Sequence, residues 1–465
     1  MKGAGVLIGA LMVMAGNAQA DLSQILERFR QVHNVPGFAL VTVDKSGITG
    51  TYTGGLADRN SERPMTAETL IRIGSITKTF NSLAALRLES EGRWSIQDKL
   101  ADIAPLAPYE NPWRDSNPIR IVHLMDHAAG FTDLTRTEMA HNTPFDSVLT
   151  ALNAGAANRV VQWPAGLYSE YSNVNAGYLG YALEQVTAEP YEQLMRDLVL
   201  HPLGLTSASL EADETTLKRL ATGYDSDGQS PIPYWHMYLA PLGAINATAR
   251  EMAALPLLMI RRGRLENDDY LPAEQIERME SPQSTLAARQ RLKYGLGLGT
   301  DQEIRGGRVW HGHLGDGDGY LSQFAYQKDL GVGYFLTINS FNHDALRLMK
   351  AAVSKALSAG MKSPKATPAM ADGADAIPLA DYVGAYRQIT WRFGWRKPDS
   401  KLSLLMKGER LFIRYGDGQA LPLVRTGPGL FRHPVEPVST MAISHHEGDW
   451  ILQGEFGSFR RISSK

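Results

Sequence analysis

The chain has 465 residues, enough for more than one domain, and it contains no cysteine. The lack of cysteine excludes disulfides, thiolate metal sites, a cysteine nucleophile and lipid-modified cysteine, so stability must come from packing. A net charge of −2 at pH 7 gives no broad attraction for nucleic acid or anionic membranes, so small-molecule or peptide substrates are the expected partners.

Residues 1–20 have the pattern of a signal peptide. Lys2 precedes an apolar run at 6–14, and the segment ends on the small-residue sequence Ala18-Gln19-Ala20. We therefore expect cleavage after Ala20 and a periplasmic or secreted protein. No later stretch reaches the roughly 20 uninterrupted apolar residues that a membrane helix needs, so membrane insertion is not expected.

Strand patterns occur near both ends of the first 360 residues. The run GFALVTVD at 37–44 predicts a buried strand, and a turn at 45–47 leads into a second extended run. A long middle stretch is mainly helical with Pro- and Gly-rich breaks. Residues 308–311, 320–326 and 331–338 predict adjacent strands, and an amphipathic helix follows at about 343–357.

A change of character after residue 360 predicts a domain boundary. Residues 361–377 are rich in Ala, Pro, Lys and Asp without core periodicity, which is typical of a linker. Beyond them, Leu402, Leu404 and Met406 alternate with their neighbours, as strands do. The expected organisation is a signal peptide at 1–20, a main domain at 21–360, a linker at 361–377 and a small β domain at 378–465.

The sequence Ser75-Ile76-Thr77-Lys78 contains the one S-x-x-K motif of the chain. On a helix, residues three apart lie on one face, so the lysine amine can reach the serine hydroxyl. The following residues are apolar nearly all round, which predicts an internal helix. Burial lowers the pKa of a lysine, so Lys78 is the candidate base that activates Ser75 as a nucleophile. The alternative is a serine N-cap followed by an exposed lysine.

A Y-x-N element follows at Tyr171-Ser172-Asn173 and leads into a helical pattern. The hydroxyl of Tyr171 can carry a proton between nucleophile and leaving group, and the amide of Asn173 can hold both the lysine and a substrate carbonyl. A second Y-x-N at Tyr109-Glu110-Asn111 lies in a proline-rich loop without a following helix. We therefore favour Tyr171.

The third element is His313-Leu314-Gly315, which we place on an edge strand facing the nucleophile. Gly315 would let substrate approach the backbone closely. The backbone N–H of Asp316, together with that of Ser75, could form an oxyanion hole. Another H-x-G at His446-Glu447-Gly448 has the pattern of an ordinary turn.

These three elements, in this order and with these long separations, resemble the signature of the serine β-lactamase and penicillin-binding-protein superfamily. Residues 121–131 and 243–251 are similar to two further segments of its class C-like branch. The resemblance covers roughly residues 22–357.

The resemblance implies an α/β (α+β) fold: an antiparallel sheet flanked by helices, with a helical insertion and the active site between them. It also implies acylation of Ser75, proton relay by Lys78 and Tyr171, deacylation by water, and no cofactor. The segment from Asp381 onward resembles the lipocalin-like, β-barrel-like domain that some relatives carry.

The chain departs from the β-lactamase pattern at the third element. Those enzymes usually have K-T-G there, where lysine and threonine help hold a substrate carboxylate, whereas His313 and Leu314 occupy these positions here. H-x-G is typical of esterase and D-aminopeptidase relatives. The resemblance thus favours a serine hydrolase acting on a peptide, including D-amino-acid peptides, or on a carboxylic ester; a β-lactamase or D-Ala-D-Ala carboxypeptidase is the alternative.

Two alternatives from other classes remain open. A metal-dependent hydrolase could use His311, His313 and Asp316, although further ligands are not recognisable at a suitable spacing. A noncatalytic ligand-binding relative could keep the same fold. In addition, Asp316 and Asp318 could favour substrates with a free amine, or could simply form an acidic turn.

Overall fold

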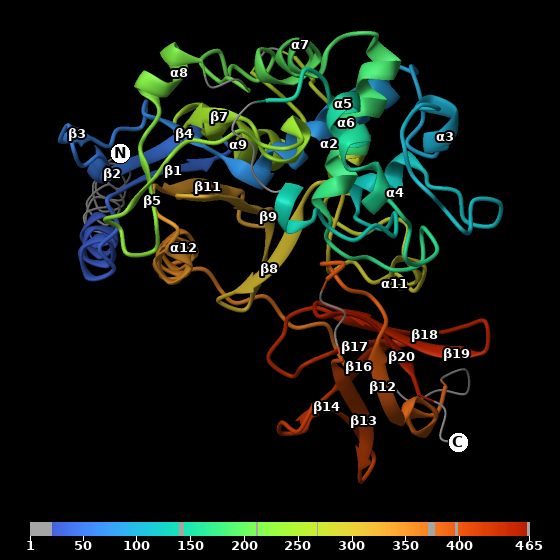
Figure 1. Cartoon of the computed structure of the whole chain (residues 1–465). Helices are drawn as coiled ribbons and strands as arrows, with labels where there is room; N and C mark the ends of the chain where they lie inside the picture. Colours follow the sequence, from blue (N-terminus) through green and yellow to red (C-terminus); the bar gives the residue numbers. More distant parts are fainter. Residues whose placement is uncertain are drawn as a thin grey trace.

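The computed structural model describes residues 21–138, 144–210, 213–266, 268–370, 377–395 and 399–462 (Figure 1). The expected signal peptide at 1–20 lies outside the described residues. Every helix in the described ranges is too short or too polar to span a bilayer.

The main domain is built on a seven-stranded antiparallel sheet in the order β3-β2-β1-β11-β10-β9-β8. Strands from the two ends of the domain meet in it, because β1 pairs with β11. Its strands are β1 (Gly37–Asp44), β2 (Gly47–Asp58), β3 (Arg63–Pro64), β8 (Asp301–Arg305), β9 (Arg308–Gly317), β10 (Tyr320–Gln327) and β11 (Val332–Ile338).

Strand alternation gives this sheet two buried faces. In β1, Phe38 and Leu40 pack into a cluster with the helix α12 (His343–Leu357) and the helical residues 21–32. Val41 and Val43 point to the opposite face and join the large core under the other helices. Successive side chains of a strand point to opposite faces, so a nearly continuous apolar strand is the pattern expected here.

The region between β3 and β8 is mainly helical and lies beside the sheet (Figure 1). Its helices are α2 (Thr77–Ser90), α3 (Leu100–Ile103), α4 (Ile121–Met125), α5 (Val148–Ala154), α6 (Asn173–Thr187), α7 (Tyr191–Met195), α8 (Glu214–Arg219), α9 (Ala254–Ile260), α10 (Ala273–Met279) and α11 (Leu286–Arg289). Its single turns are η1 (Gly74–Ile76), η2 (Arg136–Glu138), η3 (Ala156–Asn158), η4 (Arg196–Leu200), η5 (Ala240–Leu242) and η6 (Glu251–Ala253). Its short strands form two pairs, β4 (Leu70–Arg72) with β7 (Asn246–Thr248) and β5 (Gly223–Tyr224) with β6 (Pro231–Ile232).

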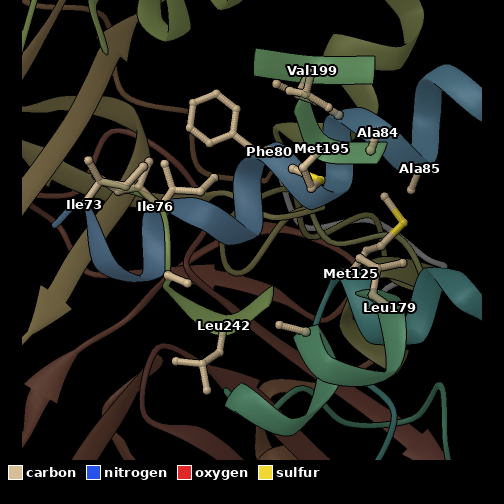
Figure 2. Close-up of a cluster of buried hydrophobic side chains, with 14 of the residues drawn as sticks. Ile73, Ile76, Phe80, Ala84, Ala85, Met125, Leu179, Met195, Val199 and Leu242 are labelled. Atoms are coloured by element: carbon tan, nitrogen blue, oxygen red, sulfur yellow. The ribbon is translucent and has the colours of Figure 1, made fainter. Parts of the chain in front are cut away.

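Helix α2 runs through the core of this domain. Phe80, Ala84 and Ala85 are fully buried, and Figure 2 shows them among apolar side chains from several elements, including Met125 and Leu179. Because the helix is surrounded by packed side chains, its first turn is held firmly in place.

The C-terminal domain is a nine-stranded antiparallel sheet in the order β15-β14-β13-β12-β20-β19-β18-β17-β16, which curls into a nearly closed barrel. The turn η7 (Leu379–Tyr382) precedes it. The strands are β12 (Gly384–Gln388), β13 (Lys401–Lys407), β14 (Arg410–Tyr415), β15 (Leu421–Pro422), β16 (Val424–Gly427), β17 (Leu430–Arg432), β18 (Met441–His446), β19 (Asp449–Gly454) and β20 (Gly457–Arg461). Residues 361–370, the described first part of the expected linker, form neither helix nor strand.

Hydrogen bonds and aromatic contacts connect the two domains. The buried side chain of Gln453 accepts a hydrogen bond from the Ala287 N–H at 2.7 Å and donates one to the Leu167 carbonyl at 3.2 Å. The Trp163 and Trp391 rings meet edge to face with centroids 5.3 Å apart. Apolar burial and satisfied buried polar groups together fix the C-terminal domain against the main domain.

The strands predicted at 37–44, 320–326 and 331–338, and the helix at 343–357, agree with β1, β10, β11 and α12. The strand β8 was not predicted; it pairs with β9 from Arg308 to Gly312 and forms the edge of the sheet there, whereas the H-x-G element that follows lies on the uncovered edge of β9, as expected. Residues 301–305 are largely polar and only partly buried, so they carry no strand signal. Beyond Gly312, however, β8 no longer covers β9.

Candidate active site

Ser75 lies in a tight turn that joins β4 to helix α2. Gly74 has φ +56°, and a Cβ at this position would come 2.7 Å from the Asp316 nitrogen. Only glycine takes up this backbone conformation without strain and leaves room for the neighbouring strand. The turn η1 then runs directly into α2, so Ser75 and Lys78 share one face.

Lys78 is buried and its amine reaches the nucleophile. Its Nζ donates hydrogen bonds to Ser75 Oγ at 3.0 Å and to the Leu242 carbonyl at 2.6 Å, while the side chain is 4% exposed. Burial is the main cause that lowers the Lys78 pKa from 10.5 to about 7, with Arg392 adding to the decrease. The exposed-lysine alternative therefore does not describe this residue.

The Tyr171 hydroxyl is hydrogen-bonded to Ser75, and burial raises the tyrosine pKa above its ordinary value. Its ring stacks on His127 at a centroid distance of 4.4 Å, and the Arg392 guanidinium lies 4.8 Å from its centroid. With the raised pKa, Tyr171 keeps its proton near neutral pH. The arrangement therefore makes Lys78 the base and Tyr171 a donor that can pass a proton on.

Asn173 begins helix α6 and is held by Asp133. The Asp133 carboxylate accepts from the Asn173 backbone N–H at 2.8 Å and from its Nδ2 at 3.1 Å. The expected bond between the amide and Lys78 is not among the hydrogen bonds of the described residues, in which Lys78 Nζ donates to Ser75 Oγ and to the Leu242 carbonyl. Asn173 Oδ1 is buried there without a partner.

His313, Gly315 and Asp316 lie on the part of β9 that β8 leaves uncovered. The His313 ring is 4% exposed, and burial together with Lys78 lowers its pKa to about 3, so it is uncharged. A Cβ at Gly315 would approach the Ile73 carbonyl to well under 3.0 Å. The close neighbour of Gly315 is thus the main chain before the nucleophile, so a residue with a Cβ does not fit here.

A pocket opens over Ser75 between the main domain and the C-terminal domain. Its lining residues are Ser75, Leu134, Tyr171, Asn173, Trp235, Met237, Leu242, Asp301, His313, Leu314, Asp316, Gly317, Asp318, Phe341, Arg392 and Phe393. All seven residues that the sequence pointed to lie around it: five line the pocket, Gly315 packs beside it, and Lys78 reaches it through Ser75.

Several residues of the site were given no role from the sequence, although His127 lies in the segment 121–131 that resembles the class C-like branch. Asp133 organises Asn173, His127 supports Tyr171, and Arg392 arrives from the loop between β12 and β13. Asp301 also lines the pocket, and burial raises its pKa to about 7. An aspartate or arginine outside any motif is indistinguishable in sequence from a solvated surface residue.

The competing motifs lie elsewhere. Tyr109 packs against Phe131 and Tyr178 rather than lining the pocket, and His446-Glu447-Gly448 forms the turn between β18 and β19 as expected. His311 stacks on the Tyr326 ring. Among the described residues, no group of three or more His, Asp or Glu side chains could hold a metal ion.

The sequence profile of the family described as Beta-lactamase matches residues 22–357. Among curated relatives, a β-lactamase of Lysobacter lactamgenus is 28% identical over 240 residues, covering 50% of this chain and 58% of the relative. Protein flp of Staphylococcus aureus (strain N315) is 25% identical over 244 residues, covering 51% and 48%. The matched segments thus span about half the length of these relatives.

Solved structures extend the similarity in fold to both domains. A crystal structure of SurE with D-Leu has a TM-score of 0.62 at 21% identity and covers 96% of this chain and 100% of its own. The octameric penicillin-binding protein homologue from Pyrococcus abyssi has a TM-score of 0.61 at 19% identity and covers 95% and 99%. A β-lactamase/D-alanine carboxypeptidase from Pseudomonas syringae has a TM-score of 0.59 at 16% identity, covering 74% and 99%. With most of the chain matched by the family profile, and with this fold, the protein belongs to the Beta-lactamase family, within the superfamily of serine β-lactamases and penicillin-binding proteins.

Proposed function

We propose that the protein is a serine hydrolase that acts through an acyl-enzyme on a peptide or a carboxylic ester. The observation that carries the proposal is the buried contact of Ser75 Oγ with Lys78 Nζ at 3.0 Å, together with the Ser75–Tyr171 hydrogen bond. A nucleophile, a base and a proton donor meet at one pocket, which is the arrangement that acyl transfer needs.

The proposed reaction has two halves. Neutral Lys78 takes the proton of Ser75 as Oγ attacks the substrate carbonyl, the bond to the leaving group breaks as Tyr171 delivers a proton to it, and protonated Lys78 returns a proton to Tyr171. Water then attacks the acyl-enzyme, its proton returns through the same groups, and the ester to Ser75 breaks. A pKa of about 7 leaves roughly half of the Lys78 amines neutral at pH 7, about 10³ times more than at a pKa of 10.5.

The oxyanion would be held by the backbone N–H groups of Ser75 and Asp316. In support, the Asp316 main chain lies against Gly74, within 2.9 Å of where a Cβ would stand. Two rigid main-chain donors cost no reorganisation as charge develops on the carbonyl oxygen.

For the substrate, we propose a peptide, D-amino-acid peptides included, or an ester. The unpartnered Asn173 Oδ1 is an acceptor suited to a substrate amide N–H. Similar folds include SurE crystallised with D-Leu and a β-lactamase/D-alanine carboxypeptidase, which support D-residues and keep β-lactam or D-Ala-D-Ala cleavage as the second candidate.

We propose that the pocket carboxylates Asp316 and Asp318 favour peptide substrates that have a free amine. Both aspartates line the pocket, and Asp316 lies 3.7 Å from the His343 ring nitrogen. Exchange of both for asparagine should reduce the preference for free over N-acylated peptides; an unchanged preference would exclude this role.

The function is tested with a panel of nitrophenyl esters, D- and L-aminoacyl anilides and a chromogenic cephalosporin. Wild type should hydrolyse one class, Ser75→Ala should hydrolyse none, and Ser90→Ala, at the exposed end of the same helix, should match wild type. Activity that survives in Ser75→Ala would exclude the proposed nucleophile.

A noncatalytic relative is distinguished by labelling. A fluorophosphonate should modify the peptide that contains Ser75, since a neutral amine next to the hydroxyl activates it. Failure to label under any condition would favour a binding protein.

We also propose export, on the N-terminal pattern of residues 1–20. N-terminal sequencing of protein from the periplasm or medium should begin at Asp21; recovery of the intact N-terminus from the cytoplasm would contradict it.

A further inference from the structure

The C-terminal domain places one arginine in the pocket of the main domain. Arg392 and Phe393, from the loop after β12, line the pocket with Ser75. The loop is anchored at this point, because the Asp133 N–H donates to the Arg392 carbonyl at 2.6 Å. The position of Arg392 is therefore set by main-chain as well as side-chain contacts.

Only one edge of the guanidinium is used by the protein. Arg392 Nε donates to Asp133 Oδ2 at 2.8 Å, whereas the terminal nitrogens have no protein acceptor among the described residues. The side chain is 42% exposed while that of Asp133 is fully buried. The two terminal amino groups are therefore open to the solvent of the pocket, where an acceptor of a ligand can replace water.

Arg392 is also the permanent cation of this pocket. His313 is uncharged, and Lys78 must be neutral to act as a base. The aspartates of the pocket have neighbours of their own, His343 for Asp316 and Trp235 for Asp318. A planar guanidinium with two free amino groups matches a carboxylate in geometry and charge better than a neutral carbonyl.

We propose that Arg392 is a specificity residue that binds a carboxylate of the substrate, so that the C-terminal domain completes the substrate site. The proposal rests on the proposed hydrolase function, and it names the substrate class more closely: peptides or esters with a free carboxylate. The ring contact between the Arg392 guanidinium and Tyr171, 4.8 Å from the centroid, brings the bound carboxylate close to the reacting groups.

The test compares matched substrates that differ in one charge. One pair is the 3-carboxyphenyl and 3-carbamoylphenyl esters of phenylacetylglycine, with the carboxylate in the leaving group. The other is the 4-nitrophenyl monoester of adipic acid and its adipamic counterpart, with the carboxylate in the acyl group. For each enzyme the measured quantity is the ratio of kcat/KM for the charged and the neutral member, in which a general loss of activity cancels.

Wild type should favour the carboxylate of at least one pair. Arg392→Gln should reduce that ratio about tenfold to a hundredfold, which is the range for losing a charge-assisted bond. Arg392→Lys should give an intermediate ratio, since lysine keeps the positive charge but lacks the planar guanidinium that binds a carboxylate through two hydrogen bonds. Arg414→Gln, an exposed arginine on β14 of the same domain, should leave the ratio unchanged.

An equal loss for both members in Arg392→Gln would show that the residue only positions Tyr171 or docks the domain, and would overturn the proposal. So would a wild type without preference for the carboxylate of either pair. Calorimetric binding of both pairs to Ser75→Ala, with and without Arg392→Gln, separates the two proposals. Arg392-dependent carboxylate binding without turnover would refute only the hydrolase function, and binding that ignores Arg392 would refute this inference.

Discussion

The lowered pKa of Lys78 predicts the pH dependence of the enzyme. Lys78 accepts the Ser75 proton only when its amine is neutral, so kcat/KM should rise as pH increases through about 7. About 1% of the amines are neutral at two pH units below the pKa, and about 99% at two units above it. Activity should therefore fall about tenfold per unit below pH 7 and level off above about pH 8.

The assay is hydrolysis of an uncharged nitrophenyl ester, followed at the isosbestic wavelength of nitrophenol. Rates of Ser75→Ala at each pH are subtracted, because hydroxide also cleaves the ester. A lysine with an ordinary pKa of 10.5 would instead give a rate that still climbs tenfold per unit at about pH 9. Such a climb, or a flat profile, would refute Lys78 as a buried base.

Two neighbouring charges shift the Lys78 pKa in opposite directions, which gives a second prediction. Asp316 raises the Lys78 pKa and Arg392 lowers it. The midpoint of the profile should therefore move to lower pH in Asp316→Asn and to higher pH in Arg392→Gln. Shifts of the same sign in both variants would show that the midpoint belongs to another group.

Three further changes test the surroundings of the nucleophile. Tyr171→Phe should lower kcat/KM by about 10²–10⁴, as expected for a lost proton relay, with an unchanged melting temperature; near-normal rates would exclude the role. Gly315→Ala should destabilise the fold by about 1–3 kcal/mol in urea unfolding, because its Cβ would press on the turn before the nucleophile. A urea midpoint of Gly315→Ala equal to that of wild type would argue against the contact. Gln453→Ala should cost about 1–3 kcal/mol by leaving two main-chain groups unpaired at the domain interface, and an unchanged unfolding curve would contradict it.

Local pattern was enough to predict the nucleophile, its base and several elements. Ser75 and Lys78 are three residues apart on one helix, so their contact follows from helix geometry. The amphipathic sequence of α12 and the nearly continuous apolar run of β1 likewise depend on near neighbours. Such features are visible in sequence because their period is set by the backbone itself.

The remaining part of the site depends on long-range packing. Arg392 and Asp133 meet although they are 259 positions apart in the chain, and nothing near either residue marks the contact. The strand β8 was not predicted, because its residues are mostly polar and partly buried and so show no alternation of apolar and polar residues. The packing of Gly315 against the Ile73 carbonyl was not predicted, since the two residues are far apart in the chain.

The central claim is that Ser75 becomes acylated with Lys78 as its base, and trapping the acyl-enzyme tests it most directly. Protein quenched in acid during turnover of the best ester or peptide is digested and analysed by mass spectrometry. The account predicts that the acyl group is found on the peptide containing Ser75, that it is lost in Ser75→Ala, and that it forms much more slowly in Lys78→Ala. Turnover with the acyl group on another residue, or undiminished acylation in Lys78→Ala, would contradict it.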